Sequence, residues 1–169
     1  GLSLGEYGAL YAAGAFDFVT GLKLLAKRAE LMDAACRAAC GGMASVLNGD
    51  AEVIREVCAE CDIDVANYNS PGQIVISGSC DAVAVASEKM KAAGAKRALF
   101  LPVGGAFHSP LMQPAAEELA EGIASVEFRQ PVCPVYQNVT ALPTTDPAEI
   151  RRNLLAQLTA PVRWTQTVL

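Results

Sequence analysis

The apolar residues that follow Asp17 recur in steps of three and four, which is the spacing of one helix face. This pattern predicts an amphipathic helix to about residue 40, with Asp17 as its N-cap and Gly41-Gly42 as its stop. A shorter helix of small residues is expected over residues 6–13. The expected buried stripe of the long helix consists of Phe18, Leu22, Leu25, Ala29, Met32 and Cys36.

Between residues 43 and 103 the pattern alternates short apolar runs with two helix-like segments. Asp50 is an expected N-cap, Ser70-Pro71-Gly72 has the residues of a tight turn, and Gly94 ends the second helix. The resulting order, β-α-β-β-α-β, is that of a ferredoxin-like module. We expect strands at 43–47, 63–69, 73–77 and 96–103, and helices at 50–61 and 81–93.

After this block the pattern predicts two more helices and a strand. Ser109 and Pro110 are typical of a helix N-terminus, and Asp146-Pro147-Ala148-Glu149 has the spacing of a capping box. A strand is expected over residues 131–138, at a sheet edge or a bulge because it contains prolines. The residues expected to face the core are Leu111, Ala115, Leu119 and Ile123 in the first helix and Ile150, Leu154 and Leu158 in the second.

Composition narrows the class of protein. The chain has 169 residues, of which 52% are hydrophobic and 18% charged, so it can bury a core. A formal net charge of −5 argues against a nucleic-acid-binding surface. No apolar run approaches the roughly 20 residues that cross a bilayer. We therefore expect a soluble, cytoplasmic protein with neither a nucleic-acid nor a membrane partner.

Six cysteines are the one compositional peculiarity, and Cys58 and Cys61 form a CxxC pair. Such a pair is typical of a redox site or of half a zinc site, but a zinc site needs two further ligands. Both cysteines also fall on the expected inner face of one helix. We expect buried structural cysteines in a reducing compartment, and no metal site.

The segment Gly1-Leu2-Ser3-Leu4-Gly5 matches G-x-S-x-G, the sharp turn that exposes a serine hydroxyl at the top of a sheet. We expect its glycines to provide space around the strained turn. A serine nucleophile needs a base, and the single histidine, His108, lies in a glycine-rich loop before a helix. Each signal alone is weak, because the motif occurs by chance and a lone histidine is more often a packing or surface residue. No acidic residue stands out as a third member, so a backbone carbonyl is the expected group that orients the histidine.

Several further segments, together with the serine motif, resemble the malonyl-CoA:acyl carrier protein transacylase family. The acyltransferase domains of fatty-acid and polyketide synthases look similar. The resemblance covers the whole chain, in order and at compatible spacings. It is carried by residues 1–7, Arg28, and residues 69–78, 105–112, 137–141 and 161–164.

The resemblance implies a ping-pong acyl transfer in which Ser3 attacks the malonyl thioester of coenzyme A. His108 would act as general base and then as general acid, oriented by the main-chain carbonyl of Gln157. The backbone N–H of Leu4 would be one oxyanion donor, and a second would come from a segment that this chain lacks.

Substrate selection is also implied by the resemblance. Arg28 would bind the malonyl carboxylate through its guanidinium fork, and Phe107 resembles the malonyl-selective form of the histidine loop. From the residues alone, the favoured interpretation of Arg28 is a solvated basic face that it shares with Lys23 and Lys27. In the same way, Phe107 could be a core residue and Gln157 a solvated helix end.

The expected fold is α/β: an α/β-hydrolase-like three-layer core, formed by residues 1–42 and 104–169, with a ferredoxin-like subdomain inserted at 43–103. We expect N-terminal and C-terminal parts of a longer protein to be absent, because no hydrophobic strand precedes the serine turn. The expected partners of a monomer are malonyl-CoA and acyl carrier protein, with no cofactor, since coenzyme A enters only as a thioester substrate. The alternatives are an acyltransferase domain of a polyketide synthase, a serine thioesterase or hydrolase, and a non-catalytic carrier-docking domain.

Overall fold

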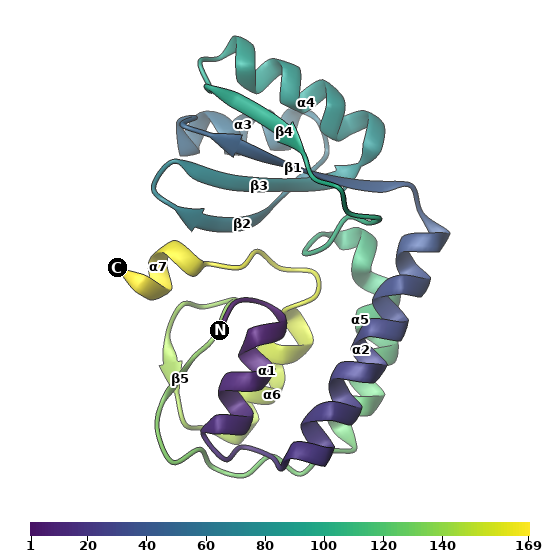
Figure 1. Cartoon of the computed structure of the whole chain (residues 1–169), viewed down its shortest axis with the longest axis vertical. Coiled ribbons are helices and arrows are strands. Elements are labelled where there is room, and N and C mark those ends of the chain that lie inside the picture. The colour runs from purple at the N-terminus through teal and green to yellow at the C-terminus, as the bar shows by residue number, and fades with distance from the viewer.

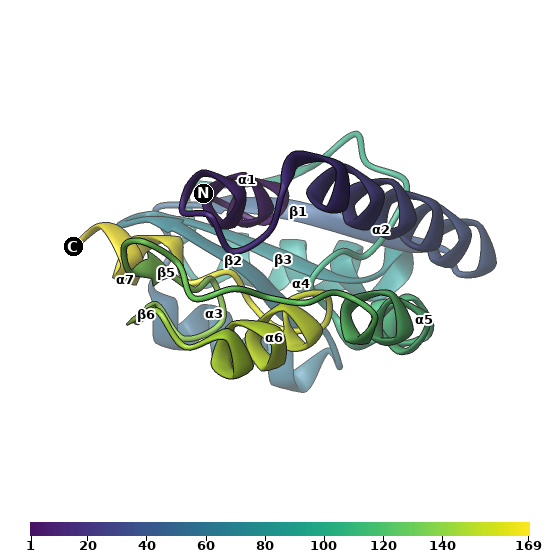
Figure 2. The ribbon, with the colours of Figure 1, turned by 90° about the horizontal axis from the view of Figure 1, so that it is seen from below.

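The structure, a computed structural model, describes all 169 residues, and the helical half of the chain occupies the lower part of Figure 1. Asp17 caps the longest helix as predicted, because its side chain accepts a hydrogen bond from the Thr20 N–H at 2.8 Å. Seen from below, the four longer helices of this half form two layers, α1 with α2 and α5 with α6 (Figure 2). They span Leu4–Ala12 (α1), Phe18–Ala38 (α2), Gln113–Ala124 (α5) and Pro147–Ala156 (α6).

Side chains from these four helices meet in one hydrophobic core. The predicted inward residues of α6 and the following turn, Ile150, Leu154 and Leu158, are fully buried in this core. Leu111, the first of the residues predicted to face the core in the segment that leads into α5, is exposed instead. The segment starts with a 3₁₀ turn, η1 (Pro110–Met112), whose tighter winding turns Met112 into the core instead.

The long helix α2 buries a different face from the predicted one. Phe18 and Leu22 are 60% and 55% exposed. The face between the neighbouring helices α1 and α5 carries Arg28, a charged residue that hydrophobic periodicity assigns to solvent. The predicted phase of the stripe is therefore wrong. No helix, α2 included, is both long and apolar enough to cross a membrane. The buried residues of α2 are Gly21, Leu24, Arg28, Leu31 and Ala35.

Four strands form the sheet in the upper part of Figure 1, in the order β2-β3-β1-β4, and each pair of neighbours is antiparallel. Helices α3 and α4 pack against this sheet through a second core that includes Ile54, Ile76 and Met90. The element order β-α-β-β-α-β is the predicted one. Its members are β1 (Gly41–Leu47), α3 (Ala51–Glu60), β2 (Asp64–Ser70), β3 (Gln73–Ser79), α4 (Cys80–Ala92) and β4 (Arg97–Phe100).

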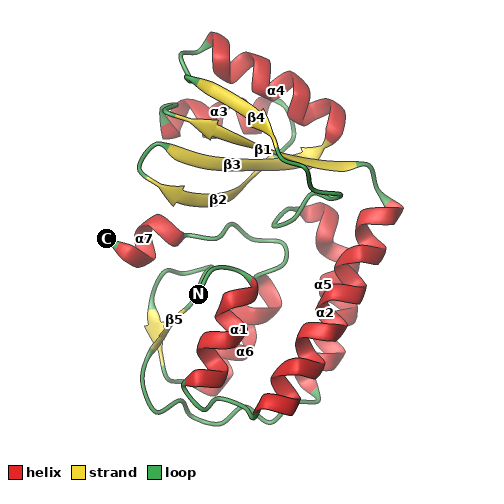
Figure 3. Ribbon diagram, viewed as in Figure 1, coloured by secondary structure: helices red, strands yellow, loops and turns green.

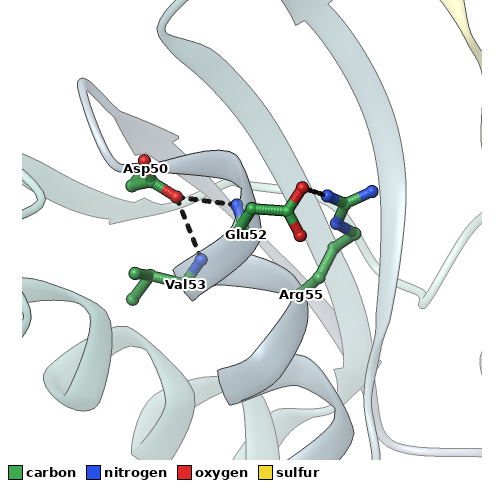
Figure 4. A network of polar contacts seen from close by, with 4 residues as sticks. All are labelled: Asp50, Glu52, Val53 and Arg55. Carbon is green, nitrogen blue, oxygen red and sulfur yellow. Dashed lines mark hydrogen bonds and ion pairs between the residues drawn. The ribbon is translucent and has the colours of Figure 1, made fainter.

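The local signals predicted for this half are present. Asp50 Oδ1 accepts hydrogen bonds from the N–H groups of Glu52 at 2.8 Å and Val53 at 3.2 Å, and Glu52 forms an ion pair with Arg55 (Figure 4). Gly72 adopts a φ of 97° in the turn between β2 and β3, a value that few other residues adopt without strain. Caps and turn residues act over a few positions, so they could be recognised without knowledge of the fold.

Two predicted features are wrong. Gly41 and Gly42 do not end α2, which stops at Ala38; they begin β1 instead. A Cβ at Gly41 would lie 2.5 Å from the backbone nitrogen of Ala106, so glycine here permits a close approach of two backbones. The strand predicted over 131–138 is reduced to β5 (Val135–Tyr136), paired with β6 (Pro143–Thr144). The prolines in that segment have no N–H for a longer ladder.

The two halves meet along the edge strand β2. The Val162 N–H donates to the Ala66 carbonyl at 2.8 Å, and the Tyr68 N–H donates to the Val162 carbonyl at 2.9 Å. The short helix α7 (Trp164–Val168) follows this segment and lies beside β2 (Figure 3). Phe107 packs against both the helical core and a small cluster on the sheet. These contacts bring the segment around Val162 and the loop that carries Phe107 to the junction between the two halves.

Candidate active site

Ser3 is the N-cap of α1, with a φ of 50° and a ψ of −107°. Such a conformation costs a non-glycine residue about 1–3 kcal/mol and is common at functional sites. Gly1 makes the turn possible, because a Cβ there would collide with the carbonyl group of Gly5. At Gly5 itself a Cβ would meet nothing within 4 Å. The predicted need for space is therefore confirmed at Gly1 and wrong at Gly5.

His108 reaches Ser3 from a loop that is far away in the sequence. Its Nε2 lies 2.9 Å from Ser3 Oγ, and its Nδ1 lies 2.8 Å from the main-chain carbonyl oxygen of Gln157. Because a carbonyl oxygen can only accept a hydrogen bond, Nδ1 carries the proton and the lone pair of Nε2 faces the serine hydroxyl. The geometry thus joins three of the sequence-predicted residues in one hydrogen-bonded chain.

The imidazole of His108 is buried, and burial lowers its pKa below the ordinary value of 6.5. The hydrogen bond to the Gln157 carbonyl opposes this shift, and the positive charge of Arg28 adds to it. A lowered pKa keeps the ring neutral at pH 7, and a neutral ring can accept a proton from Ser3. His108 also has a φ of 56°, so both members of the pair occupy a strained backbone region.

Arg28 extends from α2 into the same place and is only 5% exposed. Its Nη2 donates hydrogen bonds to Ser3 Oγ at 2.9 Å and to Gln157 Oε1 at 3.4 Å. The guanidinium carbon lies 5.7 Å from the centre of the Tyr7 ring, within the range of a cation–π contact. No hydrogen bond within the chain uses Nη1, which leaves donors for a further acceptor. A solvated basic face, the alternative interpretation of Arg28, is wrong.

The side chain of Gln157 takes part in the site as well as its carbonyl. The residue is completely buried, so the alternative of a solvated helix end is wrong. Its Nε2 donates to the Ser3 carbonyl at 3.2 Å and to Glu6 Oε2 at 2.9 Å, while its Oε1 accepts from Arg28. The sequence interpretation assigned a role to the main chain only and missed these contacts.

Glu6 is a second residue that sequence reasoning missed. Its carboxylate is 1% exposed, and Oε2 accepts hydrogen bonds from the Gln157 side chain and from the Asn138 N–H, both at 2.9 Å. The other oxygen, Oε1, is buried without a partner. Burial raises the pKa of Glu6 above its usual value, against the lowering effect of these hydrogen bonds. An acidic residue directly after a G-x-S-x-G motif was the available signal.

The side chain of Asn138 forms two hydrogen bonds with the serine turn. Its Oδ1 accepts a hydrogen bond from the Ser3 N–H at 2.6 Å, and its Nδ2 donates to the Gly1 carbonyl at 2.9 Å. The residue is buried in the segment where a regular strand was predicted. Its side chain therefore fixes the position of Ser3, a role that periodicity does not reveal.

Two further predicted residues lie at the edge of this network. Leu4 begins α1, and its backbone N–H has no acceptor within the chain, as is usual in the first turn of a helix. Phe107 precedes His108 and is half-buried between the two halves of the molecule. No cluster of three or more His, Cys, Asp or Glu side chains could hold a metal ion.

Residues 1–169, the entire chain, match the family model described as the acyl transferase domain. The chain belongs to this family. Among curated acyl transferase relatives, the malonyl CoA-acyl carrier protein transacylase of Bacillus subtilis is 44% identical over 99% of this chain. The polyketide biosynthesis protein ThaF of Burkholderia thailandensis is 46% identical over 99% of this chain, and the match covers 14% of the length of ThaF.

Solved acyl transferase structures agree with the fold. The acyl carrier protein S-malonyltransferase of Vibrio cholerae superimposes with a TM-score of 0.96 and is 46% identical, and the match covers 99% of this chain and 56% of that one. The chain likewise spans 55% of the Bacillus subtilis relative, so it corresponds to about half the length of these proteins. The shared mixed α/β fold includes the small antiparallel four-stranded sheet.

Proposed function

We propose that this chain supplies the nucleophile, the base and the carboxylate-binding residue of a malonyltransferase. The reaction would move a malonyl group from malonyl-CoA to the phosphopantetheine thiol of acyl carrier protein, through a malonyl ester of Ser3, in fatty-acid biosynthesis. The observation that carries the proposal is the position of Arg28, whose buried guanidinium donates to the same hydroxyl that His108 contacts. The identity to the Bacillus subtilis transacylase supports the same substrates.

In the first half-reaction Ser3 Oγ attacks the thioester carbonyl while its proton passes to His108 Nε2, 2.9 Å away. The Gln157 carbonyl stabilises the imidazolium that forms, because it already accepts the Nδ1–H. The Leu4 N–H, at the positive end of α1, is a donor for the oxyanion. The intermediate collapses when the C–S bond breaks and the coenzyme A sulfur takes the proton from Nε2.

The second half-reaction runs through the same groups in reverse. His108 removes the proton of the carrier's thiol, and the thiolate attacks the ester carbonyl of malonyl-Ser3. The C–O bond to Oγ then breaks, and Oγ recovers its proton from His108. Arg28 supports both halves, since a charged donor at 2.9 Å from Oγ stabilises negative charge that develops on this oxygen.

Selection of malonyl over acetyl would rest on Arg28. Its unused Nη1 donors suit the free carboxylate of the malonyl group, and charged hydrogen bonds in a buried site contribute about 1.5–3 kcal/mol each. Phe107, half-buried beside His108, would limit the size of the acyl group. The packing of Phe107 against both halves is compatible with this role and with a purely structural one.

The finer description of the fold is part of the proposal. The strand order β2-β3-β1-β4 supports a ferredoxin-like subdomain over residues 43–103. Residues 1–42 and 104–169 would belong to an α/β-hydrolase-like core, which the strained G-x-S-x-G turn into α1 supports. The active site then lies between the two parts.

A second candidate function is acyl transfer in polyketide synthesis, which the 46% identity to ThaF supports. A structure described as a type II PKS acyl-carrier protein in complex with its malonyl-transacylase is also similar, with a TM-score of 0.94. The chemistry at Ser3 would be the same, and only the carrier protein would differ.

Intact-mass spectrometry of a full-length protein that contains this chain tests the proposal. We expect a malonyl adduct after mixing with malonyl-CoA that is absent in Ser3→Ala, weaker in Arg28→Ala, and removed by acyl carrier protein. Carriers from fatty-acid and polyketide systems, offered together, separate the two candidate functions. A folded wild type without an adduct would overturn both and favour a non-catalytic docking domain. An adduct that water removes without a carrier would indicate a hydrolase or thioesterase.

A further inference from the structure

Two cysteines outside the active site face each other where α2 passes into β1 and β3 passes into α4. Cys40 Sγ lies 3.3 Å from Cys80 Sγ, and the Cys80 N–H donates to the Cys40 carbonyl at 3.1 Å. They continue the register of the ladder in which Gly41 pairs with Ser79. Directly opposed residues of this kind have Cα atoms roughly 5.5 Å apart, which is within the range that a disulfide spans.

This pair differs from the other cysteines of the chain. Cys40 is exposed and Cys80 is partly exposed, so oxidants in solution reach both. Cys58 is buried, and burial raises its pKa to about 12, which makes it unreactive. Cys133 is exposed, but no other sulfur lies within hydrogen-bonding distance of it. Only the Cys40–Cys80 pair therefore combines access with a partner in place.

We propose that Cys40 and Cys80 are a redox modification site, which a hydroperoxide such as hydrogen peroxide converts to a reversible disulfide. The sulfur of Cys40, the more exposed residue, attacks one peroxide oxygen, the O–O bond breaks, and a sulfenic acid and water result. The sulfur of Cys80 then attacks the Cys40 sulfur. The S–S bond forms, the S–O bond breaks, and the hydroxyl leaves as water with the proton of Cys80. The peroxide is reduced and the two thiols are oxidised.

Two features around the pair bear on the proposed oxidation: the pKa of Cys80 and the packing of the neighbouring Gly41. The hydrogen bond that Cys80 shares with Cys40 is the largest of the effects that raise the pKa of Cys80, so the attack of the Cys80 sulfur on Cys40 is slower at neutral than at alkaline pH. Gly41, next to Cys40, packs against the backbone of Ala106, two residues before His108. The disulfide would therefore form beside the loop that carries the proposed base.

Peptide mapping tests the proposal without reference to acyl transfer, so its outcome is independent of the proposed function. The full-length protein is reduced, desalted, exposed to hydrogen peroxide, alkylated and digested without reductant. We expect a cross-linked Cys40–Cys80 peptide that lacks two hydrogens and disappears after dithiothreitol, while Cys133 remains fully alkylated. Cross-linking at higher pH is expected to be faster.

Matched variants complete the test. In Cys80→Ser we expect no cross-link and a sulfenic acid on Cys40 that dimedone traps, whereas Cys133→Ser is expected to behave like the wild type. Alkylation of Cys40 and Cys80 to the same extent as Cys133 after peroxide treatment would overturn the proposal. A cross-link between two chains, or between either cysteine and another one, would overturn it as well.

Discussion

Replacing Gly105 by alanine tests how closely the loop that carries His108 packs against α2. A Cβ at Gly105 would collide with Cys36 Sγ and lie 3.1 Å from Cys36 Cβ. Gly104 offers a matched control, because a Cβ there would meet nothing within 4 Å. Neither glycine has a positive φ, so the backbone accepts alanine at both positions. The two substitutions therefore differ only in what the added methyl group meets.

The expected changes in the free energy of unfolding follow from two opposing effects. Alanine in place of glycine stabilises a protein by about 0.4–1 kcal/mol, because it restricts the unfolded chain. Overpacking costs about 1–3 kcal/mol. Gly104→Ala is therefore expected to be neutral or slightly stabilising, and Gly105→Ala to lose about 1–2 kcal/mol. Cys36→Ala removes the colliding sulfur, so the double variant is expected to recover part of the loss, with a coupling energy of about 1 kcal/mol.

Urea unfolding of the full-length wild type, both glycine variants, Cys36→Ala and the double variant measures these quantities. The rate of malonyl loading, recorded on the same proteins, is expected to fall for Gly105→Ala and to be unchanged for Gly104→Ala. Equal unfolding free energies for the two glycine variants would refute the packing of the loop against α2. Strict additivity of Gly105→Ala and Cys36→Ala would show that the strain arises elsewhere.

Three further results are expected. Because burial lowers the pKa of His108, its base form persists to lower pH, and the midpoint of the acid limb in the pH profile for malonyl loading is expected below 6.5. A midpoint of this limb above 6.5 would contradict the role of burial. Asn138→Ala removes the acceptor of the Ser3 N–H, so it is expected to cost about 1–3 kcal/mol in urea unfolding and to slow malonyl loading. Asn138→Asp keeps an acceptor and is expected to load faster than Asn138→Ala. Asp50→Ala is expected to cost about 1 kcal/mol without an effect on loading. Glu52→Gln removes an exposed ion pair and an acidic charge in the first turn of α3, and is expected to cost less than Asp50→Ala. Equal losses for these two variants would contradict the capping geometry in Figure 4.

The sequence predicted those parts of the fold that depend on short-range chemistry. Asp17, Asp50 and Asp146 each accept a backbone hydrogen bond at the helix start where they were expected. The phase of α2 could not be predicted, because two helices cover it and because its buried face includes Arg28. The extent of the strand over 131–138 depended on pairing partners, which the local pattern does not contain.

The site was predictable to the extent that its residues are chemically rare. Ser3 in its motif and the single histidine could be recognised from the sequence, and the structure brings Ser3 Oγ within 2.9 Å of His108 Nε2. That the two act together in catalysis stays a prediction. The carbonyl of Gln157 has no side-chain signature, and only the family resemblance indicated it. Glu6 was overlooked because an acidic residue in the first turn of a helix is usually a favourable surface residue.

The side chain of Gln157 explains how two opposite charges are buried in one site without an ion pair between them. Arg28 and Glu6 do not form a salt bridge; instead Gln157 accepts from Arg28 through Oε1 and donates to Glu6 through Nε2. A direct pair would occupy guanidinium donors that the proposed malonyl carboxylate needs, whereas the loss of either charge would leave the other buried and uncompensated. An amide is the neutral group that can contact a cation with its oxygen and an anion with its nitrogen. Glutamine at this position therefore contacts both charges and still leaves Arg28 Nη1 free, although the proposed catalytic role of the residue uses only its main chain.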